Sequence, residues 1–416
     1  MRAGREPAQG VDERRLWQRH EAMARFGATA RGGVNRQALS AEDIAARRTL
    51  ADWAAARGYR TCLDEIGNLY VRRPGTDDTA APVLTGSHLD SQPTGGRFDG
   101  TYGVLAGFEV LEALEDTGTR TRRAIEVVAW TNEEGSRFQP GTMGSAVFAG
   151  DKKLADMVEV RDSKGMRLGD ALAETLAAMP DAVRRKSGFP VAAYIEAHIE
   201  QGPRLALEDK TIGVVTGIQG SRWFEIVVTG EEAHAGTTPL GARKDAFRSA
   251  LAMAQALQEL MHDPADILRF TIGRFEVMPG SPNTVPGRVL FTIDFRHPDR
   301  EVLRERGGRI AAICQAAAGP CQVSIRETTS NDPTHFDPAV VDLVRQSAAH
   351  LGLPHMDIFS GAGHDARYMA PLCPTGMIFV PCEKGISHNE AENATPADLA
   401  AGARVLADVL VRLANR

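Results

Sequence analysis

The stretch IEVVAWTNEEGSRF, residues 125–138, passes from a nearly continuous apolar run into a polar loop that contains Glu133 and Glu134 side by side. A strand that is apolar along its whole length is typical of a parallel sheet covered by helices on both faces. In such sheets, ligands bind where the strands end. Two adjacent glutamates are most often surface residues of a solvated turn. The stretch therefore predicts a buried strand of an α/β sheet, and it raises the question of why two carboxylates follow it.

Helix and strand patterns alternate on either side of this stretch. Ser40 and Asp43 form a capping-box-like start, and Gly58 ends the same segment, which is typical of a helix. Helices between buried strands predict an α/β fold with a parallel or mixed sheet. Helix patterns occupy residues 39–58, 102–118, 338–352 and 395–416, and apolar strand patterns occupy 81–90, 124–130 and 375–381.

The middle of the chain has a different order of elements. Strand patterns occupy residues 222–230, 267–278, 288–297 and 321–328, and helix patterns occupy 240–263 and 300–319. This β-α-β-β-α-β order predicts a ferredoxin-like domain inserted at residues 220–328. Residues 35–219 and 329–416 would then form one domain. Residues 1–34 are expected to be a flexible tail and a first helix.

Bulk composition limits the possible partners and location. A chain of 416 residues is long enough for two domains, and its net charge of −6 gives no reason to expect nucleic acid or an anionic membrane as partner. No apolar run approaches the length of a membrane span, and the polar N-terminus lacks the core of a signal peptide. The five cysteines form no C-x-x-C pair, which is typical of a reduced, cytoplasmic protein.

Four groups of metal-ligand type follow the ends of the apolar strands. They are His88 with Asp99, Glu133 with Glu134, His198, and His388. A lone loop histidine is more often a hydrogen-bonded surface residue than a ligand, but four such groups at the strand ends of one sheet favour a shared site. A two-metal centre needs two or three ligands per ion and a bridging carboxylate. Imidazole and carboxylate suit zinc, manganese or cobalt alike. Asp90 is expected to hold the ring of His88 from outside the ligand set.

The ordered motifs of the chain resemble the M20 metallopeptidase clan, and within it the hydantoinase/carbamoylase family of amidases. That family includes N-carbamoyl-L-amino acid hydrolases, β-ureidopropionases and allantoate amidohydrolases. The resemblance covers nearly the whole chain from about residue 35. It rests on GSHLDSQPTGGRFDG (86–100), TNEEGSRF (131–138), GTMGS (141–145), EAHIEQGP (196–203), HAGTTP (234–239), PGSPNTVPG (279–287), DFRHPD (294–299), SGAGHDA (360–366) and ISHNEAE (386–392).

The resemblance implies a metal-dependent exopeptidase-like catalytic domain with two divalent ions per subunit. Asp99 would bridge the ions, with His88 and His198 completing one site and Glu134 and His388 the other. Glu133 would be the general base, taking a proton from the attacking water and passing it to the leaving nitrogen. Because neighbouring residues of an extended segment point in opposite directions, the loop after Asn132 has to bend for both glutamates to reach the site.

The resemblance also implies substrate contacts from the inserted domain. His234 would enter the active site of a partner subunit and stabilise the oxyanion, and a homodimer would form through the inserted domains, which would also act as a lid. Asn283 and Arg296 would bind the substrate carboxylate, for which an arginine fork is suited. Further implied contacts are Gln201, Gly361, Gly363 and His364. A helix-capping role for His234, a surface salt bridge for Arg296 and a structural hydrogen bond for His364 remain alternatives.

The leading interpretation is hydrolysis of an N-carbamoyl α- or β-amino acid to the amino acid, carbon dioxide and ammonia. The motif SHLDSQPTGGRFDG leans slightly towards β-ureidopropionase-like members, and allantoate stays open as a substrate. An exopeptidase or aminoacylase is a second interpretation, although many peptidases of the clan have an acidic ligand where this chain has His198. A third interpretation is an inactive binding protein, which the presence of all five ligand candidates and Glu133 argues against.

Overall fold

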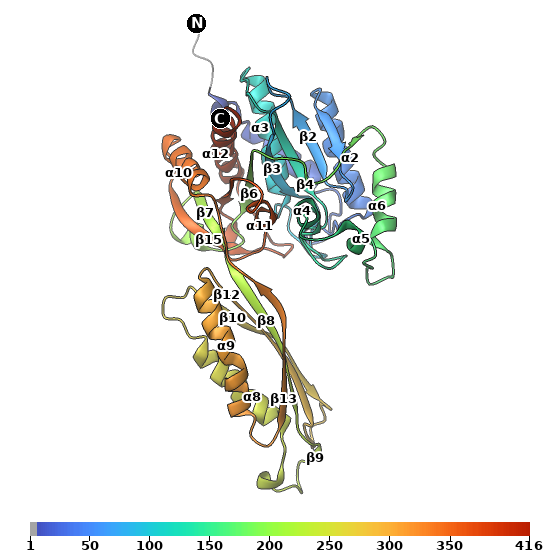
Figure 1. The fold of residues 1–416 in the computed structure, drawn as a ribbon, viewed down its shortest axis with the longest axis vertical. Coiled ribbons are helices and arrows are strands. Elements are labelled where there is room, and N and C mark those ends of the chain that lie inside the picture. Colours follow the sequence, from blue (N-terminus) through green and yellow to red (C-terminus); the bar gives the residue numbers. More distant parts are fainter. Residues whose placement is uncertain (1–5) are drawn as a thin grey trace. The chain divides into compact units, whose positions relative to one another are not determined.

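The computed structural model describes residues 6–416 and divides into two compact units. The first unit contains the chain up to Thr216 together with His335–Arg416, and the second contains Gly217–Thr334 (Figure 1). The predicted α/β fold class is confirmed. The expected insert, residues 220–328, lies within the second unit. Among the described residues, no helix has both the length and the apolar character of a membrane span.

The first unit is built on a ten-stranded sheet with the order β14-β7-β16-β6-β3-β4-β2-β1-β5, and β15 pairs with β7. Its four central strands, β16, β6, β3 and β4, are parallel to one another, and every one of their residues is buried. The strands are β1 (Arg60–Leu63), β2 (Leu69–Arg73), β3 (Val83–His88), β4 (Ile125–Trp130), β5 (Val183–Arg184), β6 (Ala193–Ile199), β7 (Ile212–Ile218), β14 (Thr334–His335), β15 (His355–Ser360) and β16 (Thr375–Val380).

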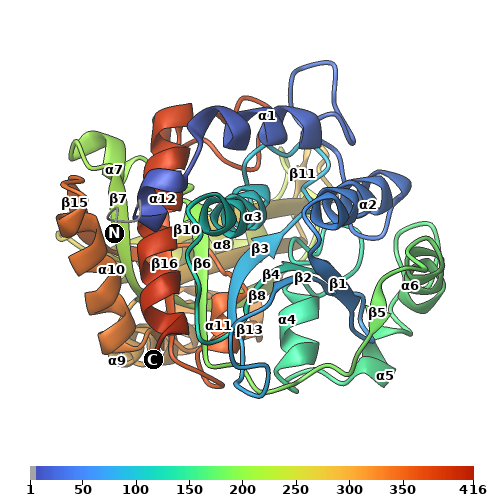
Figure 2. The same cartoon turned by 90° about the horizontal axis from the view of Figure 1, so that it is seen from above.

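Helices cover this sheet, as the apolar strands require. They are α1 (Glu13–Met23), α2 (Ala41–Ala56), α3 (Thr101–Asp116), α4 (Met143–Phe148), α5 (Leu154–Met157), α6 (Leu168–Ala177), α7 (Arg204–Leu207), α10 (Pro338–His350), α11 (Ala366–Met369) and α12 (Pro396–Ala414), with 3-10 turns η1 (Pro7–Gly10) and η3 (Glu383–Gly385). Helices α1, α3 and α12 pack against one another (Figure 2). Ser40 caps α2 as the sequence predicts, by accepting from the Asp43 N–H.

The N-terminal segment corrects one expectation. Residues 1–5 of the expected tail lie outside the described residues, but from residue 6 onward the segment is packed on the first unit. Its buried apolar side chains are Ala8, Val11, Leu16 and Met23. Arg15 donates to both carboxylate oxygens of Glu109 on α3 at 2.7 Å. Arg15, one of the charged residues that suggested a solvated tail, is therefore the partner of a buried carboxylate.

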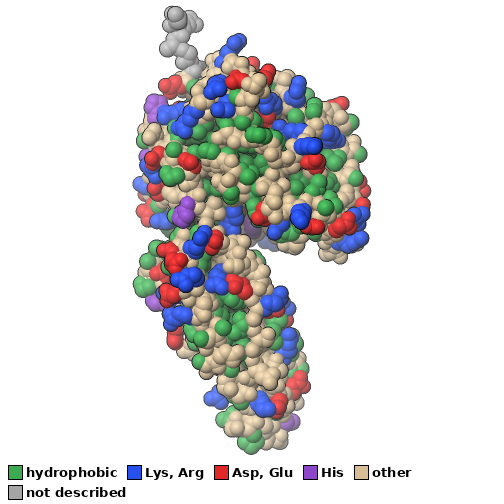
Figure 3. Space-filling model, viewed as in Figure 1, with side chains coloured by type: hydrophobic (Ala, Val, Ile, Leu, Met, Phe, Trp, Pro, Cys, Tyr) green, Lys and Arg blue, Asp and Glu red, His purple; other side chains and the backbone are tan. Residues whose placement is uncertain are grey.

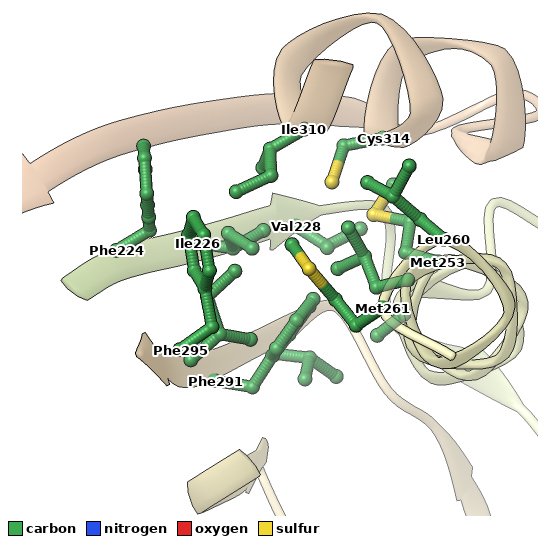
Figure 4. Packing of buried hydrophobic residues seen from close by; sticks show 14 of the residues in the cluster. Phe224, Ile226, Val228, Met253, Leu260, Met261, Phe291, Phe295, Ile310 and Cys314 are labelled. Atoms are coloured by element: carbon green, nitrogen blue, oxygen red, sulfur yellow. The ribbon is translucent and has the colours of Figure 1, made fainter. Parts of the chain in front are cut away.

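The second unit has the predicted β-α-β-β-α-β order, with the ferredoxin-like strand order β10-β12-β8-β13. Its elements are β8 (Gly220–Thr229), α8 (Ala246–Leu260), β10 (Arg269–Met278), β12 (Arg288–His297), α9 (Arg300–Ala317) and β13 (Gln322–Asn331), with a small pair, β9 (Ala233–His234) and β11 (Thr284–Val285), and the turn η2 (Leu240–Ala242). Both helices pack on one face of the sheet. Their core includes Met253 and Ile310 against Ile226 and Phe291 (Figure 4).

Charges of both signs are interspersed on the molecular surface. On the face drawn in Figure 3, Lys and Arg side chains alternate with Asp and Glu side chains over each unit. This distribution agrees with the small net charge of −6.

Candidate metal centre

The candidate ligands collect at one edge of the large sheet, where its parallel strands end. They are His88 at the end of β3, Glu133 and Glu134 after β4, His198 near the end of β6, and His388 after β16. In register, His88 lies opposite Trp130, and His198 lies opposite Phe379. Asp99 joins them from the loop that precedes α3. The strand ends thus bring together residues that are up to 300 positions apart (88 to 388).

Asp99 is shared between two groups of ligand atoms. Its Oδ1 lies 3.2 Å from His198 Nε2 and 3.7 Å from His88 Nε2. Its Oδ2 lies 3.2 Å from His388 Nε2, which in turn lies 3.4 Å from Glu134 Oε2. Two triads result, His88–Asp99–His198 and Asp99–Glu134–His388, and the ligand atoms of each triad lie within 4.8 Å of one another.

The spacing and ring orientations of these residues fit divalent cations. Two nitrogen or oxygen ligands of one tetrahedral zinc ion are roughly 3.3–3.6 Å apart, close to the distances in both triads. The Nδ1 atoms of His88 and His198 lie 2.9 and 2.8 Å from the main-chain oxygens of Asp90 and Ile199. A carbonyl oxygen only accepts, so these Nδ1 atoms carry the protons, and in the neutral rings the Nε2 lone pairs face Asp99.

Asp90 holds the ring of His88 as expected, but it does so through its main-chain oxygen, and its carboxylate has a separate role. The ring of His88 bonds to the Asp90 main-chain oxygen, while the Asp90 carboxylate accepts from the N–H groups of Glu133 and Glu134, at 3.2 Å each. These backbone donors lie in a tight, partly buried loop and need an acceptor. Asn132, with a φ of 56°, makes the bend that precedes the two glutamates. The loop is therefore bent as expected, and Asp90 holds it in place.

Electrostatics at the site favour the presence of cations. Burial and the nearby Asp99 raise the pKa of Glu134 to about 8. Burial, with Asp365 and Glu134 close by, raises the pKa of Glu133 well above its usual value. Hydrogen bonding to Asp99 raises the pKa of His388 to about 9. Carboxylates crowded in this way take up protons unless a cation neutralises them.

Four further predicted residues lie in the first unit. Gln201 Nε2 donates to Asp99 Oδ2 at 2.9 Å, so its side chain is at the site. His364 is buried, with its Nε2 2.8 Å from Ser360 Oγ and its ring 4.5 Å from the ring of His198. His364 therefore makes the structural hydrogen bond that remained an alternative to a substrate contact. Gly361 and Gly363 lie in the loop between β15 and α11, and a Cβ at either position would contact nothing within 4 Å.

The remaining predicted residues lie in the second unit, where His234 and Asn283 are neighbours and Arg296 lies apart from both. The ladder between β9 and β11 pairs His234 with Thr284, so Asn283 is next to His234. Arg296 lies opposite Ser221 near the other end of β12 and forms an ion pair with Asp294 at 2.7 Å. Arg288 and Arg296 are eight positions apart, which is about 27 Å along an antiparallel strand. Asn283 and Arg296 of one chain therefore cannot bind the same carboxylate.

Sequence reasoning missed several side chains that support the ligands. Gln92 Nε2 donates to Glu134 Oε2 at 2.8 Å, and Glu392 Oε1 accepts from the Asp99 N–H at 3.1 Å. Both residues stand inside the motifs GSHLDSQPTGGRFDG and ISHNEAE, but their spacing gives no sign of a partner. Only their proximity to ligand motifs could have suggested them.

Comparisons with known proteins find similarity along nearly the whole chain. The model of peptidase family M20/M25/M40 matches residues 84–412. An N-carbamoyl-L-amino-acid amidohydrolase of Rhizobium meliloti is 42% identical over 97% of this chain and 97% of the relative. An allantoate amidohydrolase of Escherichia coli (strain K12) is 35% identical over 98% of each chain. The crystal structure of an amidase of the hydantoinase/carbamoylase family from Burkholderia multivorans matches with a TM-score of 0.92 and 47% identity over 98% of each chain.

Proposed function

Because the chain belongs to peptidase family M20/M25/M40, among the hydantoinase/carbamoylase amidases, we propose that it hydrolyses the ureido C–N bond of an N-carbamoyl α- or β-amino acid. It is a hydrolase that acts on carbon–nitrogen bonds other than peptide bonds, and the amino acid, carbon dioxide and ammonia would be its products. The observation that carries the proposal is the division of the two Asp99 oxygens between two ligand triads, with Glu133 beside them.

The chain's own residues divide the chemistry between them. Two divalent ions, zinc, manganese or cobalt, would polarise the ureido carbonyl and lower the pKa of the attacking water. Glu133 Oε2 lies 3.4 Å from His88 Nε2, next to the first triad. Its carboxylate would accept a proton from the water and return it to the leaving nitrogen. Glu134 would stay ionised because it binds a cation. Glu133 and Glu134 would therefore differ in role although they are neighbours in the chain.

The separation of the second-unit residues supports a homodimer. If His234, Asn283 and Arg296 all serve one small substrate, they have to come from two subunits, because one chain holds Arg296 far from the neighbouring His234 and Asn283. His234 Nδ1 accepts from the N–H groups of Gly236 and Thr237, at 3.0 and 3.2 Å, so the neutral ring carries its proton on Nε2. That N–H is the donor an oxyanion needs.

Exposed apolar side chains mark the surface through which the dimer would form. Phe247 and Leu251 on α8 are exposed, and the ring of Phe247 lies 6.2 Å from that of Phe275 on β10. Strand β10 is an edge of its sheet, and an edge beside an apolar patch is suited to pairing with a second copy. The second unit would then be both a dimerisation domain and a lid.

The remaining contacts would position the substrate. Gln201, held at Asp99, would bind it from the first unit, and Arg296 would exchange Asp294 for the substrate carboxylate. Backbone amides at Gly361 and Gly363 would be accessible to it, with His364 as a structural support. Since all five cysteines are unpaired, we propose a reducing, cytoplasmic location.

Allantoate is the second candidate substrate. The similarity to the Escherichia coli allantoate amidohydrolase favours it, and allantoate also presents ureido groups and a carboxylate. The same residues would therefore bind either molecule.

Ammonia release tests the proposal. Manganese-loaded protein is assayed with N-carbamoyl-β-alanine, an N-carbamoyl-L-α-amino acid and allantoate, with chelator-treated protein as the control. Chelator-sensitive release from one of the first two supports the proposal, and release from allantoate alone selects the second candidate. Cleavage of a dipeptide without any release of ammonia would overturn both.

A further inference from the structure

The buried carboxylate of Glu392 contacts the backbone of the shared ligand. The Glu392 side chain lies in the loop between η3 and α12, and the residue is only 2% exposed. Its Oε1 accepts from the N–H groups of Phe98 and Asp99, at 3.0 and 3.1 Å. Two consecutive backbone donors held by one oxygen fix the direction in which the Asp99 side chain leaves the main chain.

The second oxygen of Glu392 holds another ligand-bearing segment. Ser387 Oγ donates to Glu392 Oε2 at 2.9 Å, and the next residue is His388. Ser387 Oγ also accepts from Gln201 Nε2 at 3.1 Å and lies 3.2 Å from Asp99 Oδ2. One carboxylate therefore connects the segment of Asp99 with that of His388.

His388 needs such an anchor more than the other ligands do. Its side chain is 51% exposed, whereas the side chains of His88 and His198 are 2% and 1% exposed. Its backbone has a φ of 52°, in the left-handed region that costs energy for a residue with a side chain. Packing alone does not fix His388, so hydrogen bonds from its own segment have to do so.

The absence of a side chain at Gly96 is independent evidence that the fold reserves space for the Glu392 carboxylate. A Cβ at residue 96 would lie 2.0 Å from both Cδ and Oε1 of Glu392. Any side chain there would displace the carboxylate. The glycine in the GGRFDG segment thus leaves the space that Glu392 occupies.

We propose that Glu392 is a positioning residue for the metal pair, which retains the ion of the Asp99–Glu134–His388 triad by holding Asp99 and the Ser387–His388 segment together. The inference rests on the metal centre of the proposed function, but not on its substrate. Partners that orient ligands from outside typically contribute 10–100-fold to metal affinity.

The test compares Glu392→Ala with Glu390→Ala, a matched control in the same loop. The Glu390 carboxylate faces Thr29 Oγ1 at 2.6 Å and Arg31 Nε at 3.2 Å, and neither partner belongs to the ligand set. Metal-free full-length protein is titrated with Mn²⁺, and bound ions per chain are measured by calorimetry and elemental analysis. We expect wild type and Glu390→Ala to bind two ions, and Glu392→Ala to bind its second ion about 10–100-fold more weakly.

Turnover provides a second measurement. In Glu392→Ala, excess Mn²⁺ should restore most of kcat while KM stays unchanged, whereas a purely structural role would leave metal affinity as in wild type. If Glu392→Ala fails to fold, Glu392→Gln and Gly96→Ala test the same contact. Two ions bound with wild-type affinity in the folded variants would overturn the proposal, as would the absence of any ion from wild type. Two ions in wild type without ammonia release would overturn the proposed substrate alone.

Discussion

Glu133 and Glu134 are neighbours in the chain but differ in their surroundings. Glu133 lies beside His88 and Glu134 beside His388, each at 3.4 Å. The left-handed backbone of Asn132 and the two hydrogen bonds to Asp90 bring both side chains to the site. In the proposed mechanism, their adjacency would deliver one proton acceptor and one metal ligand from a single loop.

Replacement of each glutamate by glutamine should separate these roles. Glu133→Gln removes the proton acceptor and keeps the ligands, so kcat should fall by about 10²–10⁴-fold with two ions still bound. Glu134→Gln should lose metal as well as turnover. Ammonia release and elemental analysis of both variants measure the difference, and loss of metal from Glu133→Gln would contradict the assignment.

Metal binding should also release protons. In the metal-free protein the pKa values of Glu134 and His388 are raised to about 8 and about 9, so both groups are largely protonated at pH 7. A cation has to displace these protons, and its apparent affinity should therefore rise with pH up to about 9. Calorimetry at pH 7 in buffers of different ionisation enthalpy measures the released protons. An affinity that is independent of pH between 6 and 9 would disagree with this expectation.

Among the structural elements, the buried strands and the domain order could be predicted from the sequence, because local residue patterns determine them. The sequence showed the apolar runs of β3, β4 and β16 and the β-α-β-β-α-β order of the second unit. Buried strands and amphipathic helices each have a characteristic spacing of apolar residues, which makes them recognisable. The carboxyl ends of those strands then indicated the ligand set. The packing of the N-terminal segment was missed, because polar residues such as Arg15 acquire partners only in the folded chain.

Hydrogen bonds between distant segments also left no trace in the sequence. Nothing in the pattern distinguishes the Asp90 carboxylate from its main-chain oxygen as the partner of His88, or marks Glu392 as a partner of Asp99. The distance between Asn283 and Arg296 depends on the length and direction of β12. Motif resemblance implied that His234 acts in a partner subunit, but it assigned Asn283 and Arg296 to one carboxylate without showing the distance between them.

Arg36 provides a test at the scale of elements. Its buried guanidinium donates to the carbonyls of Leu89 and Met23, at 2.6 and 2.9 Å, and to Thr101 Oγ1 at 2.9 Å. It thus ties the segment after α1 to the His88 loop and to the start of α3. Arg36→Met would leave these acceptors buried and unpaired, which should lower the free energy of unfolding by about 3 kcal/mol.

The matched control for Arg36 is Arg31→Met. Arg31 is exposed and, within residues 6–416, pairs with Glu390 at 3.2 Å, so its loss should change stability by less than about 1 kcal/mol. Urea denaturation of both variants measures the two changes. Equal stabilities would mean that the N-terminal segment is not held to the ligand loops through Arg36.

In the proposed homodimer, each active site needs residues from two chains. His234→Ala and Asp99→Ala should each be inactive as homodimers, for different reasons. Co-expression should restore up to about a quarter of wild-type activity, because half of the dimers would then combine one intact metal centre with the intact His234 of the other chain. Ammonia release from the purified mixture measures the recovery, and an inactive mixed dimer would contradict the shared site.

The metal content of the active protein is the most direct test of whether Asp99 serves two ligand triads at once. Elemental analysis after removal of free metal, run beside an ammonia assay of the same sample, measures it. We expect two divalent ions per chain in active wild type and fewer than one ion per chain in inactive Asp99→Ala. Full activity with a single ion per chain, or unchanged metal content in Asp99→Ala, would contradict it.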